Sequence, residues 1–224
     1  LSFTDNRQDA SLQAGHFNDF LMLGRLRSAI YHALKEAPEN TLTLDNISDI
    51  VFKKLNLHED EYAREPSADP GWPDLENERA VKDYILIRIL YDLKRGWRYN
   101  TPNLEQCGLL EISYSRLSEF AAKEDFFKGL DLFDELPPEK REEYILQILN
   151  FFRTSYAFEY YKLLDKREET QERLKNKLHE EKLWSLDLDE YLDLPYILLP
   201  RSIGDAKNRA FTASIGPMSY LGKY

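Results

Sequence analysis

The chain contains a single cysteine among its 224 residues, together with only four histidines and nine glycines. One cysteine excludes an intramolecular disulfide and any zinc site built from several cysteines. No apolar run approaches the roughly 18 residues that a membrane-spanning helix needs, and the first residues lack the apolar core of a signal peptide. These absences favour a cytoplasmic protein whose partners do not include a membrane.

The motifs of the common catalytic sites are missing as well. The sequence has no G-x-x-x-x-G-K-[ST], no G-x-G-x-x-G, no H-E-x-x-H and no G-x-S-x-G. The acidic run Glu59–Glu61 lacks the spaced oxygen ligands and the glycine of a calcium loop, which favours a solvated loop. No histidine lies near Cys107 in sequence, so a partly buried and unreactive thiol is expected there. No catalytic residue, metal site or cofactor of the chain's own is predicted.

What the sequence does contain is an unevenly distributed negative charge. The 30 Lys and Arg residues face 40 Asp and Glu residues, a net charge of -10. Residues 37–80 have a net charge of -7 and residues 101–150 of -6, whereas residues 81–100 and 201–224 each have a net charge of +3. Because phosphate binding depends on clustered Lys and Arg, only the two basic stretches are candidates for contact with nucleic acid. The alternative is that both are ordinary solvated surfaces.

Four stretches carry apolar residues at the three- and four-residue spacing of amphipathic helices. They are residues 12–35, 44–55, 76–95 and 139–164. Shorter helical patterns cover 117–122 and 126–133, and the almost wholly charged run 165–182 is interpreted as a solvated helix. With hydrophobic residues at 42% and aromatic residues at 13%, the chain can form a core. The predicted fold is therefore mainly α, a multi-helix domain.

The helical pattern breaks at residues 97–114. The stretch 97–102 is followed by 108–114, which reads as a short strand, and together they predict a small β-hairpin. A winged-helix-like arrangement would put Trp97 and Arg98 at the tip of this hairpin, where such side chains stack on bases or contact phosphates. The alternative is that Trp97 packs within the hairpin.

The first ten residues, 1–10, read Leu-Ser-Phe-Thr-Asp-Asn-Arg-Gln-Asp-Ala. This segment resembles the one that opens the second RecA-like domain of superfamily 2 helicases of the DEAD/DEAH type, most closely a subgroup with Phe-(Ser/Thr)-Asp-(Ser/Asn)-Arg-Gln-Asp-Ala. In that family a strand ends at the aromatic residue, a polar turn follows, and a helix packs back on the sheet. The local pattern of this chain predicts the same order. Residues 102–110 are similar to a segment of the large helicases of this subgroup, some of which belong to phage-defence systems.

The resemblance implies a division of the chain into three parts. Residues 1–36 would begin the second RecA-like domain, 37–200 would form a helical accessory domain, and 201–224 a loop-rich return segment. The family's Walker A lysine, acidic pair and arginine-rich motifs are absent, so the chain would be a fragment without ATPase activity of its own. ATP and Mg²⁺ are implied for the parent protein only, and the remaining helicase domains are implied partners.

In the family, the turn after the first strand lies near the bound nucleic acid. The resemblance therefore makes the polar residues of this turn candidates for phosphate contact, with a purely structural role for Arg7 and Asp5 as the alternative. The basic stretch adds three further candidates. The predicted nucleic-acid-binding residues are Thr4, Asn6, Arg7, Gln8, Arg95, Trp97 and Arg98.

Two functions remain open at this point. In the first, the chain is the accessory helical portion of an ATP-dependent nucleic-acid helicase, with DNA the expected nucleic acid. In the second, it is a stand-alone helical protein–protein interaction module, in which the aromatic run at residues 151–161 docks a partner protein.

Overall fold

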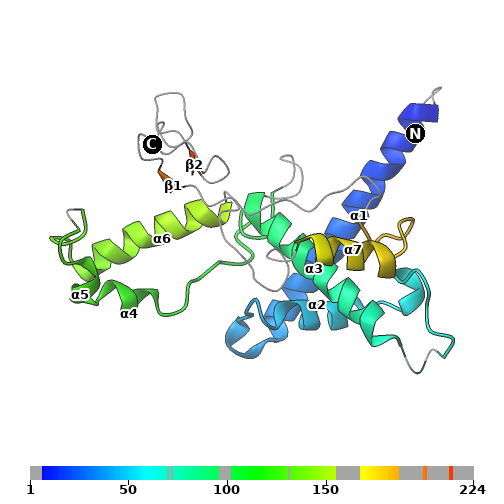
Figure 1. Cartoon of the computed structure of the whole chain (residues 1–224), viewed down its shortest axis with the longest axis horizontal. Coiled ribbons are helices and arrows are strands. Elements are labelled where there is room, and N and C mark those ends of the chain that lie inside the picture. Colours follow the sequence, from blue (N-terminus) through cyan, green and yellow to red (C-terminus); the bar gives the residue numbers. More distant parts are fainter. Residues whose placement is uncertain are drawn as a thin grey trace. The chain divides into compact units, whose positions relative to one another are not determined.

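The computed structural model describes residues 7–69, 71, 73–95, 102–130, 132–154, 167–186, 199–200 and 212–213. These residues are mainly helical (Figure 1), which confirms the predicted fold class. No helix within this part of the chain is long and apolar enough to cross a bilayer.

The chain divides into two compact units. The first unit consists of residues 1–110 and 161–193, and the second unit of residues 111–160 and 194–224. The three-part division implied by the resemblance concerns the domains of a parent protein, and it stays a prediction.

In the first unit, α1 (Arg7–Glu36), α2 (Ile47–Leu55), α3 (Leu75–Arg95) and α7 (Arg167–Lys177) pack together, joined in part by the 3-10 turns η1 (Pro38–Asn40) and η2 (Glu59–Glu61). Helix α3 is central, because it packs against both α2 and α7. Its residues from Tyr84 to Leu90 are all buried, including Arg88. A helix that is apolar around most of its circumference has to be enclosed by neighbours.

Helix α1 contributes a single apolar stripe to this core. Met22, Leu26 and Ile30 recur at four-residue spacing and are 3%, 0% and 3% exposed. The following helix, α2, ends at Asn56, whose φ of 49° lies in the left-handed region that terminates many helices. The sequence predicted both helices, with α1 starting earlier and α2 starting later than expected.

The charged run 165–182 differs from its prediction as a solvated helix. Helix α7 is present, but Thr170, Leu174 and Leu178 lie on one side of the chain at four-residue spacing and are all buried. Arg173 forms an ion pair with Asp83 of α3. Long charged side chains can cover apolar surface with their stems while their ends stay in water. Thr170 and Leu174 of α7, with Leu178 just beyond its end, therefore give this charged segment a buried side in the first unit.

The end of α7 is also fixed by backbone hydrogen bonds to a segment more than 110 residues earlier. Ala63 and Leu178 form an isolated antiparallel bridge. The Arg64 amide donates to the Lys177 carbonyl at 2.8 Å, and the His179 amide donates to the Tyr62 carbonyl at 2.9 Å. The acidic segment after α2 is thus tied to α7 rather than being a free loop.

A buried ion pair joins α1 to α3. Arg27 Nε and Nη2 donate to the two carboxylate oxygens of Asp92 at 3.0 and 2.6 Å, and the Asp92 side chain is only 1% exposed. The Asp92 carbonyl in turn accepts a hydrogen bond from Asn103 Nδ2 at 2.8 Å. One residue of α3 therefore holds α1 on one side and the segment after α3 on the other.

The segment that begins at Asn103 corrects the strand predicted over 108–114. Asn103 and Gln106 accept each other's backbone amides through their side-chain oxygens, which closes a helical turn. Gly108, with φ +68°, ends this turn. Residues 109–114 are irregular rather than a strand, and residues 97–101 lie outside the described part of the chain. Cys107 sits on the turn and is exposed, not partly buried as expected.

The second unit contains α4 (Leu117–Ala121), α5 (Glu124–Phe127) and α6 (Pro138–Thr154), with two-residue strands β1 (Leu199–Pro200) and β2 (Thr212–Ala213) paired in parallel. Helix α4 packs on α6, and two hydrogen bonds cross between the segments: Tyr114 Oη to Asn150 at 3.1 Å and Ser118 Oγ to Glu142 at 2.6 Å. The helix predicted over 126–133 is displaced to α5, followed by turns. The predicted continuation of α6 over 155–164 lies outside the described residues.

Replacing Arg27 tests whether the ion pair with Asp92 supports the first unit. Arg27→Met removes the cation and leaves a buried carboxylate behind, so we expect the free energy of unfolding to fall by about 3–5 kcal/mol. Arg79→Met, on α3 itself, removes an exposed contact to Glu76 at 4.0 Å and should cost less than about 1 kcal/mol. Urea unfolding followed by circular dichroism measures both, and equal losses for the two variants would contradict this role for Arg27.

Candidate functional site

The predicted nucleic-acid-binding residues fall at the ends of described helices or outside them. Arg7 and Gln8 are the first two residues of α1, and Arg95 is the last residue of α3. Thr4, Asn6, Trp97 and Arg98 lie outside the described residues, as do the side chains of the other three. The structure therefore neither assembles this set nor separates it, and the set stays a prediction.

One basic residue of the stretch 81–100, Arg88, is buried rather than exposed at the surface. Arg88 is 3% exposed, and its guanidinium lies 4.8 Å from the centre of the Tyr84 ring. It helps to line a cavity of about 420 Å³ between α1, α3 and residues 180–185. Asp19, Glu180 and Glu181 line the same cavity with Lys182. Because carboxylates outnumber cations there, the cavity is unsuited to a phosphate.

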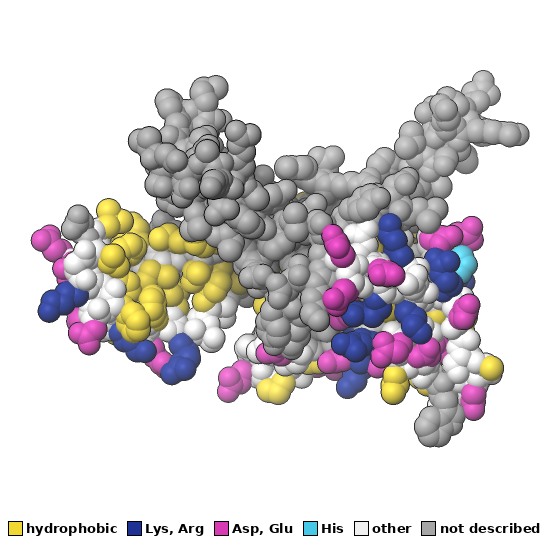
Figure 2. Space-filling model, in the orientation of Figure 1, with side chains coloured by type: hydrophobic (Ala, Val, Ile, Leu, Met, Phe, Trp, Pro, Cys, Tyr) yellow, Lys and Arg dark blue, Asp and Glu magenta, His cyan; other side chains and the backbone are white. Residues whose placement is uncertain are grey.

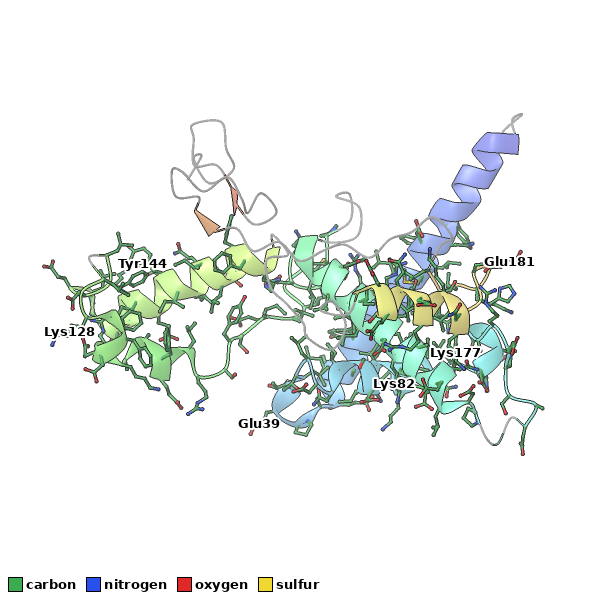
Figure 3. The ribbon with its side chains drawn as sticks, viewed as in Figure 1. Glu39, Lys82, Lys128, Tyr144, Lys177 and Glu181 are labelled. Atoms are coloured by element: carbon green, nitrogen blue, oxygen red, sulfur yellow. The ribbon has the colours of Figure 1, made fainter. Side chains whose placement is uncertain are left out.

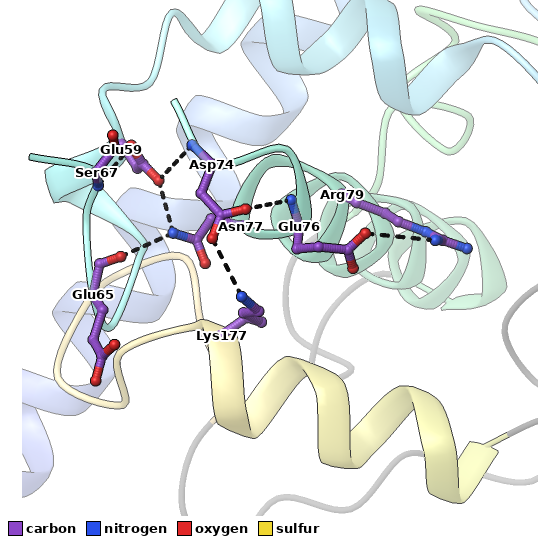
Figure 4. Close-up of polar contacts among 8 residues, drawn as sticks. All are labelled: Glu59, Glu65, Ser67, Asp74, Glu76, Asn77, Arg79 and Lys177. Carbon is purple, nitrogen blue, oxygen red and sulfur yellow. Dashed lines mark hydrogen bonds and ion pairs between the residues drawn. The ribbon is translucent and has the colours of Figure 1, made fainter. Parts of the chain in front are cut away.

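The acidic segment 59–74 is organised around one carboxylate, that of Glu59 (Figure 4). Glu59 accepts hydrogen bonds from the Ser67 amide at 3.1 Å, from the Asp74 amide at 3.1 Å and from Asn77 Nδ2 at 2.7 Å. Asn77 is 2% exposed, and its Nδ2 also donates to the Glu65 carbonyl at 3.0 Å. The carboxylate of Glu59 therefore satisfies backbone and side-chain donors, where the sequence predicted a merely solvated acidic loop.

Two titratable groups beside Glu59 have shifted pKa values. Tyr62 is 2% exposed, and burial, followed by the negative charges of Glu59, Glu78 and Asp74, raises its pKa to about 12. The phenol consequently stays neutral at physiological pH and is not a general base. The pKa of Asp74 is lowered, first by the hydrogen bond from the Glu76 amide and then by Lys177.

These polar groups therefore form a structural network. Asp74 Oδ1 accepts the Glu76 amide at 2.8 Å in the first turn of α3, and Oδ2 lies 3.3 Å from Lys177 Nζ at the end of α7. The network joins the segment after α2 to two helices. Among the described residues, no group of three His, Cys, Asp or Glu side chains is placed to hold a metal ion.

The second unit presents a different kind of surface. Helix α6 carries seven large apolar residues between Tyr144 and Phe152, and none of them is buried. Figure 2 shows hydrophobic side chains gathered over the part of the molecule formed by α4, α5 and α6. We call the most exposed of these residues the α4–α6 face: Phe120, Phe126, Leu130, Leu132, Tyr144 and Ile148.

The aromatic residues of this face are in contact with one another. Phe120 lies 5.4 Å from both Phe126 and Phe127 between ring centroids, and Phe127 lies 5.8 Å from Phe133. Phe126 is 59% exposed, whereas Phe127 is 4% exposed. Tyr144 projects from the neighbouring helix α6 (Figure 3). The face is thus the exposed continuation of a small buried cluster.

Arg141 fixes the helices beneath the face. It is the only buried residue among those described in α6. Its guanidinium donates to the carbonyls of Phe133 and Asp134 at 2.8 and 3.0 Å, and to both carboxylate oxygens of Glu124 at 3.0 and 2.9 Å. These hydrogen bonds lower the pKa of Glu124. A bidentate, multiply bonded arginine gives the turn between α5 and α6 a defined geometry.

Comparison with known proteins finds no relative of this chain. No protein-family model, curated protein or solved structure matches the chain. The sequence contained one signal for the α4–α6 face, because residues 117–152 are rich in large apolar side chains. The structural role of Glu59 had no such signal, because its hydrogen-bond donors lie 8 to 18 residues further along the chain.

Replacing Asp74 by asparagine tests the polar network through its pH dependence. A carboxylate whose pKa is lowered in the folded state adds stability above its ordinary pKa of 3.8, and this stability is lost as the pH falls through the folded-state value. We therefore expect Asp74→Asn to unfold at lower urea concentration than the wild type at pH 7.

The same comparison at acidic pH shows whether the charge of Asp74 is responsible for the difference in stability. The difference between Asp74→Asn and the wild type should shrink below pH 3.8, since a protonated aspartate resembles an asparagine. The exposed Asp60, replaced by asparagine, serves as the control and should show no difference at either pH. A difference for Asp74→Asn that is the same at pH 7 and pH 3 would show that its charge does not matter.

Proposed function

We propose that the chain is the accessory helical portion of an ATP-dependent nucleic-acid helicase. The single observation that carries this proposal is the ten-residue resemblance at residues 1–10. A helix after the first residues is what the resemblance expects, but α1 begins at Arg7 and so includes Arg7 and Gln8, which were expected in the turn before it. The ATP and Mg²⁺ site would belong to the remaining helicase domains of the parent protein, since the chain lacks a phosphate loop.

The reading frame that encodes the chain tests this proposal. It should encode a phosphate-loop motif N-terminal to Leu1 and arginine-rich motifs C-terminal to Tyr224. The chain by itself should hydrolyse no ATP above a buffer blank. A frame without a phosphate loop, or turnover abolished by a point change within residues 1–224, would refute the proposal.

Binding of DNA by the isolated chain should be weak. The net charge of -10 opposes the approach of phosphates, and few cations are candidates for contact. We expect a Kd of about 10⁻⁴–10⁻⁶ M at physiological salt, the range of non-specific binding. If Arg95 and Arg98 both contact phosphates, replacing them by alanine should reduce the slope of log K against log salt by about 2.

Titration of fluorescent single- and double-stranded DNA at several salt concentrations measures this slope. Loss of two positive charges anywhere could weaken binding, so the double variant Arg79→Ala/Arg116→Ala is the charge-matched control. The side chains of Arg79 and Arg116 are 64% and 80% exposed. Arg79 pairs with Glu76, and Arg116 pairs with Glu119. His58→Ala is a neutral control. Equal slopes for the two arginine pairs would remove Arg95 and Arg98 from the nucleic-acid interface.

A second candidate function, a helical protein–protein interaction module, is favoured by a different observation. The α4–α6 face leaves six large apolar side chains 40–73% exposed in one unit. Monomeric proteins rarely expose contiguous apolar patches of more than a few hundred Å², and larger ones mark interaction sites. The part of the aromatic run 151–161 beyond Thr154, which was expected to dock the partner, lies outside the described residues.

A further inference from the structure

Helix α7 and the residues directly after it are held in the first unit by few buried side chains. We call residues 167–180 the α7 strap. Among its described side chains only Thr170, Leu174 and Leu178 are buried, and eight of its 14 residues are charged. In α3, by contrast, every residue from Tyr84 to Leu90 is buried. Segments with few buried contacts open locally at a lower free energy than the core of a protein, so the strap should detach more easily than α3.

Ion pairs join the strap to the rest of the first unit. Three of them are formed by side chains that are 22–42% exposed: Arg173 with Asp83, Lys177 with Asp74, and Glu180 with Arg64. Burial raises the pKa of Asp83 above its ordinary value, and the charge of Arg173 offsets only part of this shift. Because water reaches all six side chains, salt screens their attraction. The attachment of the strap should therefore weaken as the salt concentration rises.

The chain stays tied to the first unit beyond the end of the strap. Trp184 and Leu186 are 0% and 3% exposed, and the Arg25 guanidinium lies 5.5 Å from the centre of the Trp184 ring. The backbone hydrogen bonds between the strap and residues 62–64 gather at its end, at Lys177 and His179. Loss of the ion pairs and of these hydrogen bonds would thus release residues 167–180 while Trp184 stays in the core.

We propose that the α7 strap opens and closes as one unit on a folded body of α1, α2 and α3, and that ionic strength sets the balance between the two states. Low salt favours the closed state, because the ion pairs are then least screened. High salt favours the open state, since it weakens these pairs and leaves the apolar core around α3 in place. Opening exposes the side of α3 that α7 contacts. The strap is thus a salt-sensitive control of access to that side of α3.

Hydrogen–deuterium exchange of the full chain, measured amide by amide at low and at high sodium chloride, tests the proposal. At low salt the protection factors of the α7 amides should be lower than those of residues 85–89 in α3 by about tenfold or more, because the strap opens while α3 stays folded. High salt should lower the protection of the α7 amides by a further factor of about five, as the loss of weak exposed ion pairs predicts. The α3 amides should keep their protection.

Variants separate the ionic attachment from the apolar one. Arg173→Gln removes the cation that pairs with Asp83, so it should lower the protection of the α7 amides about fivefold at low salt and reduce their response to salt. Leu174→Ala removes a buried contact and should lower this protection about thirtyfold or more at both salt concentrations, with the response to salt unchanged. Arg116→Gln is the matched control: it removes an arginine that pairs with Glu119 in the second unit, and it should leave the protection of α7 as it is.

Two results would overturn the proposal in different ways. Equal protection of the α7 and α3 amides, lost together at high salt or in Leu174→Ala, would show that α7 unfolds only with the rest of the first unit. Separate exchange of the α7 amides that neither salt nor Arg173→Gln alters would show a strap whose opening does not depend on the ion pairs.

Discussion

The first unit depends on the buried contact between Arg27 and Asp92, because one aspartate serves two neighbours at once. Its carboxylate binds the guanidinium of α1, and its backbone carbonyl binds Asn103 of the turn that follows α3. Burial of a charge is costly unless a partner and hydrogen bonds compensate it, so this contact specifies a single position of α1 on α3. Helix α1 and the turn that begins at Asn103 are thus joined through the same residue of α3.

The two units differ in how many apolar side chains they bury. The first unit encloses apolar side chains from its four helices, α1, α2, α3 and α7. The second unit, among its described residues, buries only Ala121, Phe127 and Arg141, and one of these three is charged. An arginine with four protein acceptors gives a turn precise geometry, but it contributes little of the apolar burial that stabilises a small domain. The second unit is therefore better suited to presenting a surface than to folding around a large core.

Long helices with regularly spaced apolar residues could be predicted from the sequence. Polar groups whose hydrogen-bond partners lie elsewhere in the chain could not. Helices α1 and α3 follow directly from apolar residues at four-residue spacing, which sequence displays without any tertiary knowledge. Helix α7 has only two buried residues at this spacing, Thr170 and Leu174, with Leu178 just beyond its end, so its charged positions concealed its buried side. The strand expected over 108–114 failed because Asn103 and Gln106 cap each other and Gly108 ends the turn. The nucleic-acid-binding set was predicted from the resemblance at residues 1–10 and from the basic stretch 81–100, and its side chains lie outside the described part of the chain.

The bridge between Ala63 and Leu178 has a consequence for synthesis of the protein on the ribosome. The first unit is discontinuous in sequence: residues 111–160 of the second unit are translated before the strand-like segment 177–179 that completes the first. Helices α1 to α3 must wait, with the side of α3 that receives α7 uncovered, while α4 to α6 emerge with their own apolar residues. Nascent chains that expose such surfaces are prone to aggregate, and domains fold as units only when all their parts are available. Chaperone contact is therefore expected to be greatest while α4 to α6 are leaving the exit tunnel and to fall once Leu178 has emerged.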